Sequence, residues 1–192
     1  MSNDFRSGFV SIIGAPNVGK STLLNQLIGE KLAIISPKPQ TTRNRILAVK
    51  TNPGFQMIFL DTPGIHQARG NLNLAMVRTA LATLATVDLI LFLVEAHSPS
   101  NQSNQRVLEA LQNVETQTLL VVNKIDLVSE ESLARIVERF QALHQFKGSA
   151  HISALYGTGI NDLIAQIVPL LPMGPAYYPE DTLTDLPERF FC

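Results

Sequence analysis

One stretch decides the fold of this chain: Gly14-Ala15-Pro16-Asn17-Val18-Gly19-Lys20-Ser21, which fits the pattern G-x-x-x-x-G-K-S/T. It follows an apolar run, residues 9–13, that predicts a strand, and it opens residues 20–27, whose spacing predicts a helix. The N–H groups of such a loop converge on a phosphate, and Lys20 adds a positive charge between the β- and γ-phosphates of a nucleotide. We predict phosphate binding by this loop together with Thr22; the alternative is an ordinary glycine turn.

On the carboxyl side of this loop, strand-like runs alternate with segments of helical spacing, which is typical of βαβ units. The turn Asn52-Pro53-Gly54 predicts a hairpin, the one antiparallel pair that we expect. The predicted fold is α/β of the P-loop type, a mostly parallel six-stranded sheet with an antiparallel edge hairpin and helices on both faces. The expected strands are residues 9–13, 46–50, 56–60, 89–94, 118–122 and 150–153, and the expected helices are residues 20–27, 72–86, 101–112, 129–146 and 160–171.

Composition restricts the class of protein. The chain has 192 residues, 45% of them hydrophobic, which suits one compact domain. Fifteen Lys and Arg against sixteen Asp and Glu give a net charge of −1, so bulk charge does not attract nucleic acid or anionic lipid. A single cysteine, Cys192, excludes an intramolecular disulfide and favours a reducing, cytoplasmic setting. No apolar run approaches the roughly 20 residues of a spanning helix, and the first residues do not resemble a signal peptide.

The residues Asn123-Lys124-Ile125-Asp126 follow the apolar run 118–122 and predict which base is bound. The Asp126 carboxylate can accept from guanine N1–H and from the 2-amino group. Adenine offers neither donor, and an unpaired buried acceptor costs about 1–3 kcal/mol. We expect Asn123 to join this segment to the phosphate loop and the Lys124 stem to lie along the base. GTP and GDP are therefore the predicted ligands, and an ATP-dependent enzyme is the alternative. Backbone N–H groups of Ser153-Ala154-Leu155 are expected to face guanine O6.

Two further segments predict a metal site and nucleotide-dependent switches. Asp61-Thr62-Pro63-Gly64 follows the run 56–60; Asp61 would orient Mg²⁺ and the Gly64 N–H would reach the γ-phosphate. In the long loop of residues 31–43, Thr42 is expected to close over Mg²⁺, with Thr41 the alternative. The predicted metal ligands are Ser21, Thr42 and Asp61, and the predicted switches are residues 31–44 and 62–76. His66, in the second switch, either contacts the reacting water or phosphates or is a solvated loop residue.

In this order the motifs resemble the GTPases of the TrmE, Era and Der group, and more narrowly the Era family. The segment Pro39-Gln40-Thr41-Thr42-Arg43 supports this, and Asn44 stands where the TrmE and Der relatives usually have an aspartate. The resemblance implies a role in small ribosomal subunit maturation, ribosomal RNA binding through a KH domain, and peripheral association with the inner face of the membrane. Residues 1–172 would be the GTPase domain, and residues 173–192 resemble the linker to that KH domain. No G-x-x-G loop follows residue 172, so the KH domain itself is missing from this sequence and the piece is expected to be monomeric.

Hydrolysis is predicted to be slow, because Ile65 stands where related switch enzymes carry a glutamine that orients water. The resemblance implies K⁺ as a compensating cation with Asn17 as its ligand; Asn17 is otherwise a polar loop residue. The expected catalytic residues are thus Lys20, Thr42, Gly64 and Asn17. The alternatives are a nucleotide-gated RNA-binding adaptor with incidental turnover, or a TrmE- or Der-like GTPase acting in RNA modification or ribosome assembly.

Overall fold

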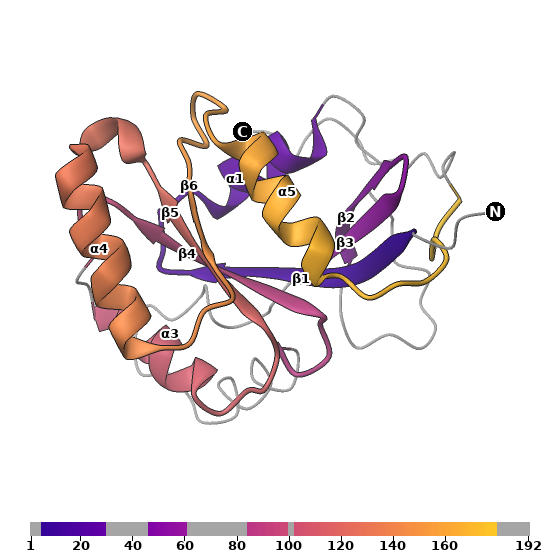
Figure 1. Cartoon of the computed structure of the whole chain (residues 1–192), viewed down its shortest axis with the longest axis horizontal. Helices are drawn as coiled ribbons and strands as arrows, with labels where there is room; N and C mark the ends of the chain where they lie inside the picture. The colour runs from indigo at the N-terminus through magenta and orange to yellow at the C-terminus, as the bar shows by residue number, and fades with distance from the viewer. Residues whose placement is uncertain (1–4, 30–45, 61–83, 100–101, 180–192) are drawn as a thin grey trace.

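The computed structural model describes residues 5–29, 46–60, 84–99 and 102–179. Its centre is a six-stranded sheet in the order β2-β3-β1-β4-β5-β6, parallel throughout except for the edge pair β2 and β3 (Figure 1). The predicted fold class is confirmed. The strands are β1 (Arg6–Gly14), β2 (Ile46–Asn52), β3 (Phe55–Leu60), β4 (Leu89–Glu95), β5 (Thr118–Asn123) and β6 (Ser149–His151). The described helices are α1 (Lys20–Ile28), α3 (Gln102–Leu111), α4 (Glu130–Leu143) and α5 (Ile160–Ile167), with 3₁₀ turns η1 (Ile125–Leu127) and η2 (Val168–Leu170).

The two central strands β4 and β5 explain why helices cover both faces. Successive side chains of a strand point to opposite faces, and here almost every one is buried. Leu91 and Val121 pack into the layer that includes α1 and α5, whereas Phe92 and Val122 pack into the layer that includes α3 and α4. The sheet is therefore enclosed between two apolar layers, and polar chemistry is left to the strand ends.

Two predicted helices are shorter than the sequence suggested. The helix predicted for residues 129–146 ends at Leu143, because His144 turns to an extended backbone. The chain then brings Phe146 back to stack on Phe92, with ring centroids 6.2 Å apart. The helix predicted for residues 160–171 ends at Ile167 and tightens into η2, where Pro169 lacks the N–H that another α-turn would need.

The predicted strand at residues 150–153 is also displaced, since β6 covers Ser149–His151. Ile152 continues to donate to Val122, and Ser153 already belongs to the following loop, where it pairs with Thr158. The remaining expected helix, residues 72–86, lies largely outside the described residues.

Residues 172–179, which we call the C-terminal strap, run along the amino ends of β1 and β3. The Ser7 N–H donates to Pro172 O at 3.1 Å, and the Ser7 hydroxyl donates to Pro175 O at 2.6 Å. Gln56, which is fully buried, holds the end of the strap: its Oε1 accepts from the N–H groups of Tyr177 (2.8 Å) and Tyr178 (3.0 Å), and its Nε2 donates to Tyr178 O (2.9 Å). The first residues of the predicted linker are thus fastened to the sheet at the end opposite the phosphate loop.

Replacing Gln56 by Ala should release the strap. Four hydrogen bonds of about 1 kcal/mol each are lost, three to the strap and one to the Thr51 hydroxyl, so the free energy of unfolding should fall by about 3–4 kcal/mol in urea titrations. The exposed Gln141 of α4 provides a matched Gln→Ala control, which should change stability by less than about 0.5 kcal/mol. Equal effects of the two substitutions would show that the contacts of Gln56 with the strap do not stabilise the fold.

Candidate nucleotide-binding site

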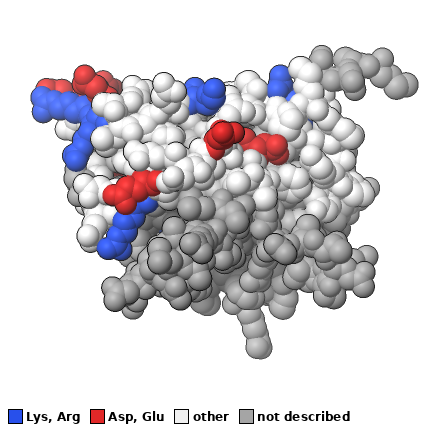
Figure 2. Space-filling model, turned by 90° about the horizontal axis from the view of Figure 1, so that it is seen from below, with Lys and Arg blue, Asp and Glu red and all other residues white. Residues whose placement is uncertain are grey.

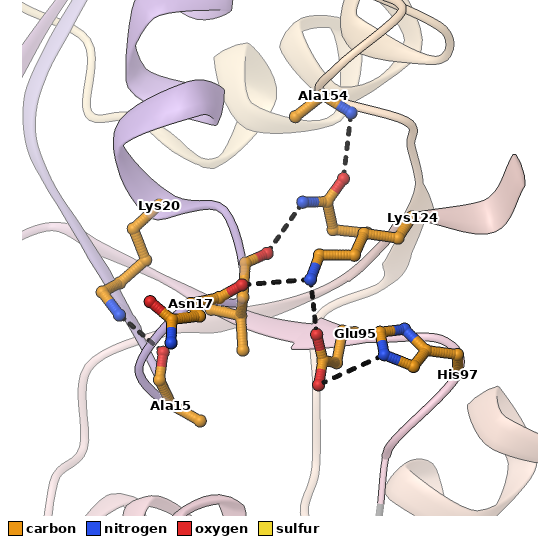
Figure 3. A network of polar contacts seen from close by, with 9 residues as sticks. Ala15, Asn17, Lys20, Glu95, His97, Lys124 and Ala154 are labelled. Carbon is orange, nitrogen blue, oxygen red and sulfur yellow. Dashed lines mark hydrogen bonds and ion pairs between the residues drawn. The ribbon is translucent and has the colours of Figure 1, made fainter. Parts of the chain in front are cut away.

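The predicted site residues within the described ranges lie at one edge of the sheet, where β1, β4, β5 and β6 end (Figures 1 and 3). The phosphate loop leaves β1 at Gly14 and enters α1 at Lys20. The segment Asn123–Asp126 leaves β5 and turns into η1. The loop that begins at Ser153 follows β6. Carboxyl ends of adjacent parallel strands are where open α/β sheets bind ligands, so the topology itself assembles this site.

The two glycines of the phosphate loop have packing reasons as well as a phosphate-binding one. Gly14 has a φ of +156°, and a Cβ there would lie 2.2 Å from the carbonyl oxygen of Leu93. Gly19, with a φ of +100°, caps the start of α1, and its Cβ would lie 2.4 Å from Nδ2 of Asn123. Only glycine fits either position without moving β4 or the Asn123 side chain.

Lys20 points back over the phosphate loop that it follows. Its Nζ donates to the carbonyl oxygens of Gly14 (3.1 Å) and Ala15 (2.6 Å), and the contact with Ala15 is drawn in Figure 3. Burial lowers the pKa of the Lys20 ammonium from 10.5 to about 8. A nearby anion favours the charged form, so a bound phosphate would raise this pKa again. The Lys20 ammonium is therefore held at the loop, where the charge of a bound phosphate would offset the cost of its desolvation.

The buried side chain of Asn123 joins the phosphate loop to the loop after β6. Its Nδ2 donates to the carbonyl oxygen of Val18 at 2.8 Å, and its Oδ1 accepts from the N–H of Ala154 at 2.9 Å. The first of these bonds is the link between loops that the sequence predicts. The second bond was not predicted. It ties the backbone of Ala154 to the same carboxamide that holds the phosphate loop.

Lys124 forms a second link, shown in Figure 3. Its Nζ donates to the carbonyl oxygen of Asn17 at 3.1 Å and pairs with Oε2 of Glu95 at 2.6 Å. His97 lies on the other side of this carboxylate, with Nε2 3.9 Å from Oε1. Sequence reasoning missed Glu95. The available signal was its position, because an acidic residue ends the otherwise apolar strand β4 and so lies at the ligand-binding edge.

Asp126 lies in η1 and its side chain is exposed, so its carboxylate is open to a base. The loop of residues 153–158 closes on itself: the Ser153 N–H donates to Thr158 O and the Thr158 N–H donates to Ser153 O, both at 3.1 Å. Ala154 is buried, whereas Leu155 is 69% exposed. The Ser153 hydroxyl is buried and has no partner among the described residues.

The predicted metal site is only partly within the described residues. Ser21 and its neighbour Thr22 are exposed at the start of α1, beside Lys20. A serine hydroxyl at a helix start that faces phosphates is a fitting Mg²⁺ ligand, since Mg²⁺ prefers a few protein oxygens and substrate phosphates. The described part of the chain holds no group of three or more His, Cys, Asp or Glu that could bind a metal by itself. The other predicted residues lie outside the described ranges: Thr41, Thr42, Asp61, Thr62, Pro63, Gly64, Ile65 and His66.

One face of the molecule shows how its charged side chains are distributed. On the face seen in Figure 2, Lys and Arg side chains lie scattered among Asp and Glu, without a basic patch over the described residues. No helix in residues 5–29, 46–60, 84–99 or 102–179 is long and apolar enough to cross a membrane.

Comparison with known proteins agrees with this geometry. The family model described as 50S ribosome-binding GTPase matches residues 9–124. GTPase Era of Geotalea uraniireducens is 54% identical over 187 residues, which cover 97% of this chain and 63% of that protein. This chain therefore spans less than two thirds of the length of that relative.

Two solved Era structures share the fold. Era in complex with MgGDPNP and nucleotides 1506–1542 of 16S ribosomal RNA matches with a TM-score of 0.77 and 38% identity, over 95% of this chain and 63% of that one. An Aquifex aeolicus Era variant bound to GDP and AlF₄⁻ matches with a TM-score of 0.76 and 38% identity, over the same shares. The chain thus belongs to the family described as 50S ribosome-binding GTPase, and it is similar to the Era GTPases that its sequence resembles.

Proposed function

We propose that this chain binds GTP and GDP with Mg²⁺ and hydrolyses GTP slowly, as the switch of an Era-type protein that acts in small ribosomal subunit assembly. The observation that carries the proposal is the pair of links from the phosphate loop to the base-reading segment. Asn123 contacts Val18 O and Lys124 contacts Asn17 O. A phosphate site and a base site held together in this way fit one nucleoside phosphate.

The phosphate part of the site would bind through the chain's own fixed groups. Backbone N–H groups at the start of α1 point toward the anion, and the helix dipole adds a partial positive charge. Lys20 contributes a full charge at the same place. Mg²⁺, held by Ser21 and by the proposed ligands Thr42 and Asp61, would neutralise charge on the β- and γ-phosphates. The Gly64 N–H would add a contact that exists only while the γ-phosphate is present, which makes residues 62–76 the proposed second switch.

The base part selects guanine. The exposed carboxylate of Asp126 accepts from two neighbouring donors on guanine, and the Lys124 stem covers the base plane. Thr62 and Pro63 would complete the loop around the phosphates, and Leu155 would offer its N–H beside that of Ala154. Because Ala154 already donates to Asn123, the Leu155 N–H is the better candidate for guanine O6.

The ribosomal part of the proposal rests on the relatives. The family description names the 50S subunit, whereas the Era structure contains a 16S ribosomal RNA fragment, which belongs to the small subunit. We favour the small subunit because of the 38% identity to that RNA complex. We place the RNA contact in a KH domain reached through the segment that follows residue 172, and the protein in the cytoplasm. No described residue adds support to membrane association.

Guanine specificity is the most direct test of the proposed function. Competition against labelled GDP should show displacement by unlabelled GTP but not by ATP at a hundredfold excess. Asp126→Asn reverses the hydrogen-bonding pattern at the base and should shift preference by at least tenfold toward xanthosine diphosphate. Glu138→Gln, an exposed acid in the second half of α4, serves as the charge-matched control. Displacement by ATP, or guanine preference retained in Asp126→Asn, would contradict the base assignment.

Hydrolysis should depend on K⁺ if Asn17 is a cation ligand. Asn17 has a left-handed backbone with a φ of 63°, so glycine removes its side chain without adding strain. We expect faster single-turnover hydrolysis in KCl than in NaCl, and no such difference in Asn17→Gly. Thermal unfolding with GDP and aluminium fluoride should show the same cation dependence. Equal rates in both salts would exclude the K⁺ site. Absence of phosphate release in any salt, even with ribosomal subunits, would favour the adaptor function instead.

A further inference from the structure

Glu95, the last residue of β4, pairs with Lys124, although Glu95 itself has no proposed contact with the phosphates or the base. Its side chain is only 15% exposed, and its Oε2 lies 2.6 Å from Nζ of Lys124. Among the described residues, the carboxylate pairs with Lys124 and has His97, which is 45% exposed, 3.9 Å away on its other side.

The side chain of Lys124 has two proposed interactions that both require a fixed conformation. The stem has to remain beside the base, and the ammonium donates to the carbonyl oxygen of Asn17 at 3.1 Å. A lysine side chain is a flexible four-carbon stem with a compact charge, so without a fixed anion it samples many rotamers. The Lys124 side chain is still 31% exposed, and solvent competes for its ammonium.

The two residues joined by the hydrogen bond from Lys124 to Asn17 both have an unusual backbone conformation. Asn17 and Lys124 have φ values of 63° and 62°, and they are the two non-glycine residues with positive φ in the described part of the chain. Such conformations persist where surrounding contacts hold them. The ammonium of one strained residue binds the carbonyl oxygen of the other, and the Glu95 carboxylate is the group that fixes the ammonium (Figure 3).

We infer that Glu95 is a positioning residue for nucleotide binding: by fixing Lys124, it keeps the base site and the phosphate loop in register. This inference rests on the proposed guanine-nucleotide function. Loss of the carboxylate would let the ammonium leave Asn17, so that the cover over the base and the support of the phosphate loop would weaken together. The effect should appear mainly as faster nucleotide release.

The direct test is dissociation of fluorescent GDP from the wild type and from Glu95→Ala. We expect release about tenfold faster in the variant, the low end for a hydrogen bond to a charged group because the pair is partly exposed. Glu95→Gln keeps the shape and an acceptor oxygen but not the charge, and should lie between the two. His97→Ala removes the neighbour on the other side of the carboxylate and should release GDP at the wild-type rate.

A double-mutant cycle separates positioning from a general structural effect. If Glu95 acts through Lys124, Glu95→Ala should change GDP release by less than about twofold in a Lys124→Ala background. Two multiplying effects, or unchanged release in the single variant, would overturn the inference. Should Glu95→Ala fail to fold, the same cycle is measured with Glu95→Gln.

A nucleotide-free measurement keeps this inference separate from the proposed function. The amide of Val18 shares its peptide bond with the Asn17 carbonyl, so its NMR shift reports the Lys124 contact. Glu95→Ala and Lys124→Ala should shift it alike without nucleotide, and His97→Ala should leave it unchanged. A wild type that does not bind GDP would refute the proposed function, while an unmoved Val18 shift in Glu95→Ala would refute the link itself.

Discussion

The carboxamide of Asn123 is the group on which the rest of the site depends. It is planar and rigid, with its donor on Val18 O and its acceptor on the N–H of Ala154, so the phosphate loop and the loop after β6 are held at opposite ends of one small group. The amide is buried, and removal would leave two backbone groups unpaired at a cost of about 1–3 kcal/mol each. The same amide packs against Gly19, where a side chain would collide with it. The contact therefore requires a glycine at this position of the phosphate loop.

The molecule places its two functional connections at opposite ends of the sheet. The loops of the proposed nucleotide site leave the carboxyl ends of β1, β5 and β6, whereas the C-terminal strap is fastened at the amino ends of β1 and β3. The strand β3 belongs to both ends: Gln56 near its start holds the strap, and its last residue, Leu60, directly precedes the proposed metal ligand Asp61. The buried strand β3 therefore lies between the strap and the position from which the proposed metal ligand follows.

The sequence predicted what depends on local pattern. The apolar runs and the helical segments between them predicted the six strands and the mostly parallel topology. The G-x-x-x-x-G-K-S/T and N-K-x-D motifs predicted that the loop after β1 and the segment after β5 are joined through Asn123, as its bond to Val18 O confirms. Contacts between distant residues were less accessible. The early end of α4 depends on Phe146 returning to Phe92, which no local spacing reveals. Glu95 was missed because a single acid at a strand end has no motif, and the hold of Gln56 on the strap joins residues 122 positions apart. The packing reason for Gly14 was also hidden from local pattern, since its missing side chain admits the backbone of β4.

The most direct test of the central role of Asn123 is hydrogen exchange at the Ala154 amide in the nucleotide-free protein. In the wild type this amide should be protected, because it donates to a buried side chain. Asn123→Ala should lower that protection by roughly tenfold or more, since the acceptor is lost, while the Ile152 amide, which donates to Val122 in the sheet, stays protected. Asn123→Asp keeps an acceptor for Ala154 and loses only the donor to Val18, so protection at Ala154 should largely survive. Unchanged exchange at Ala154 in Asn123→Ala would contradict the account, because the two loops would then be held together by something other than this amide.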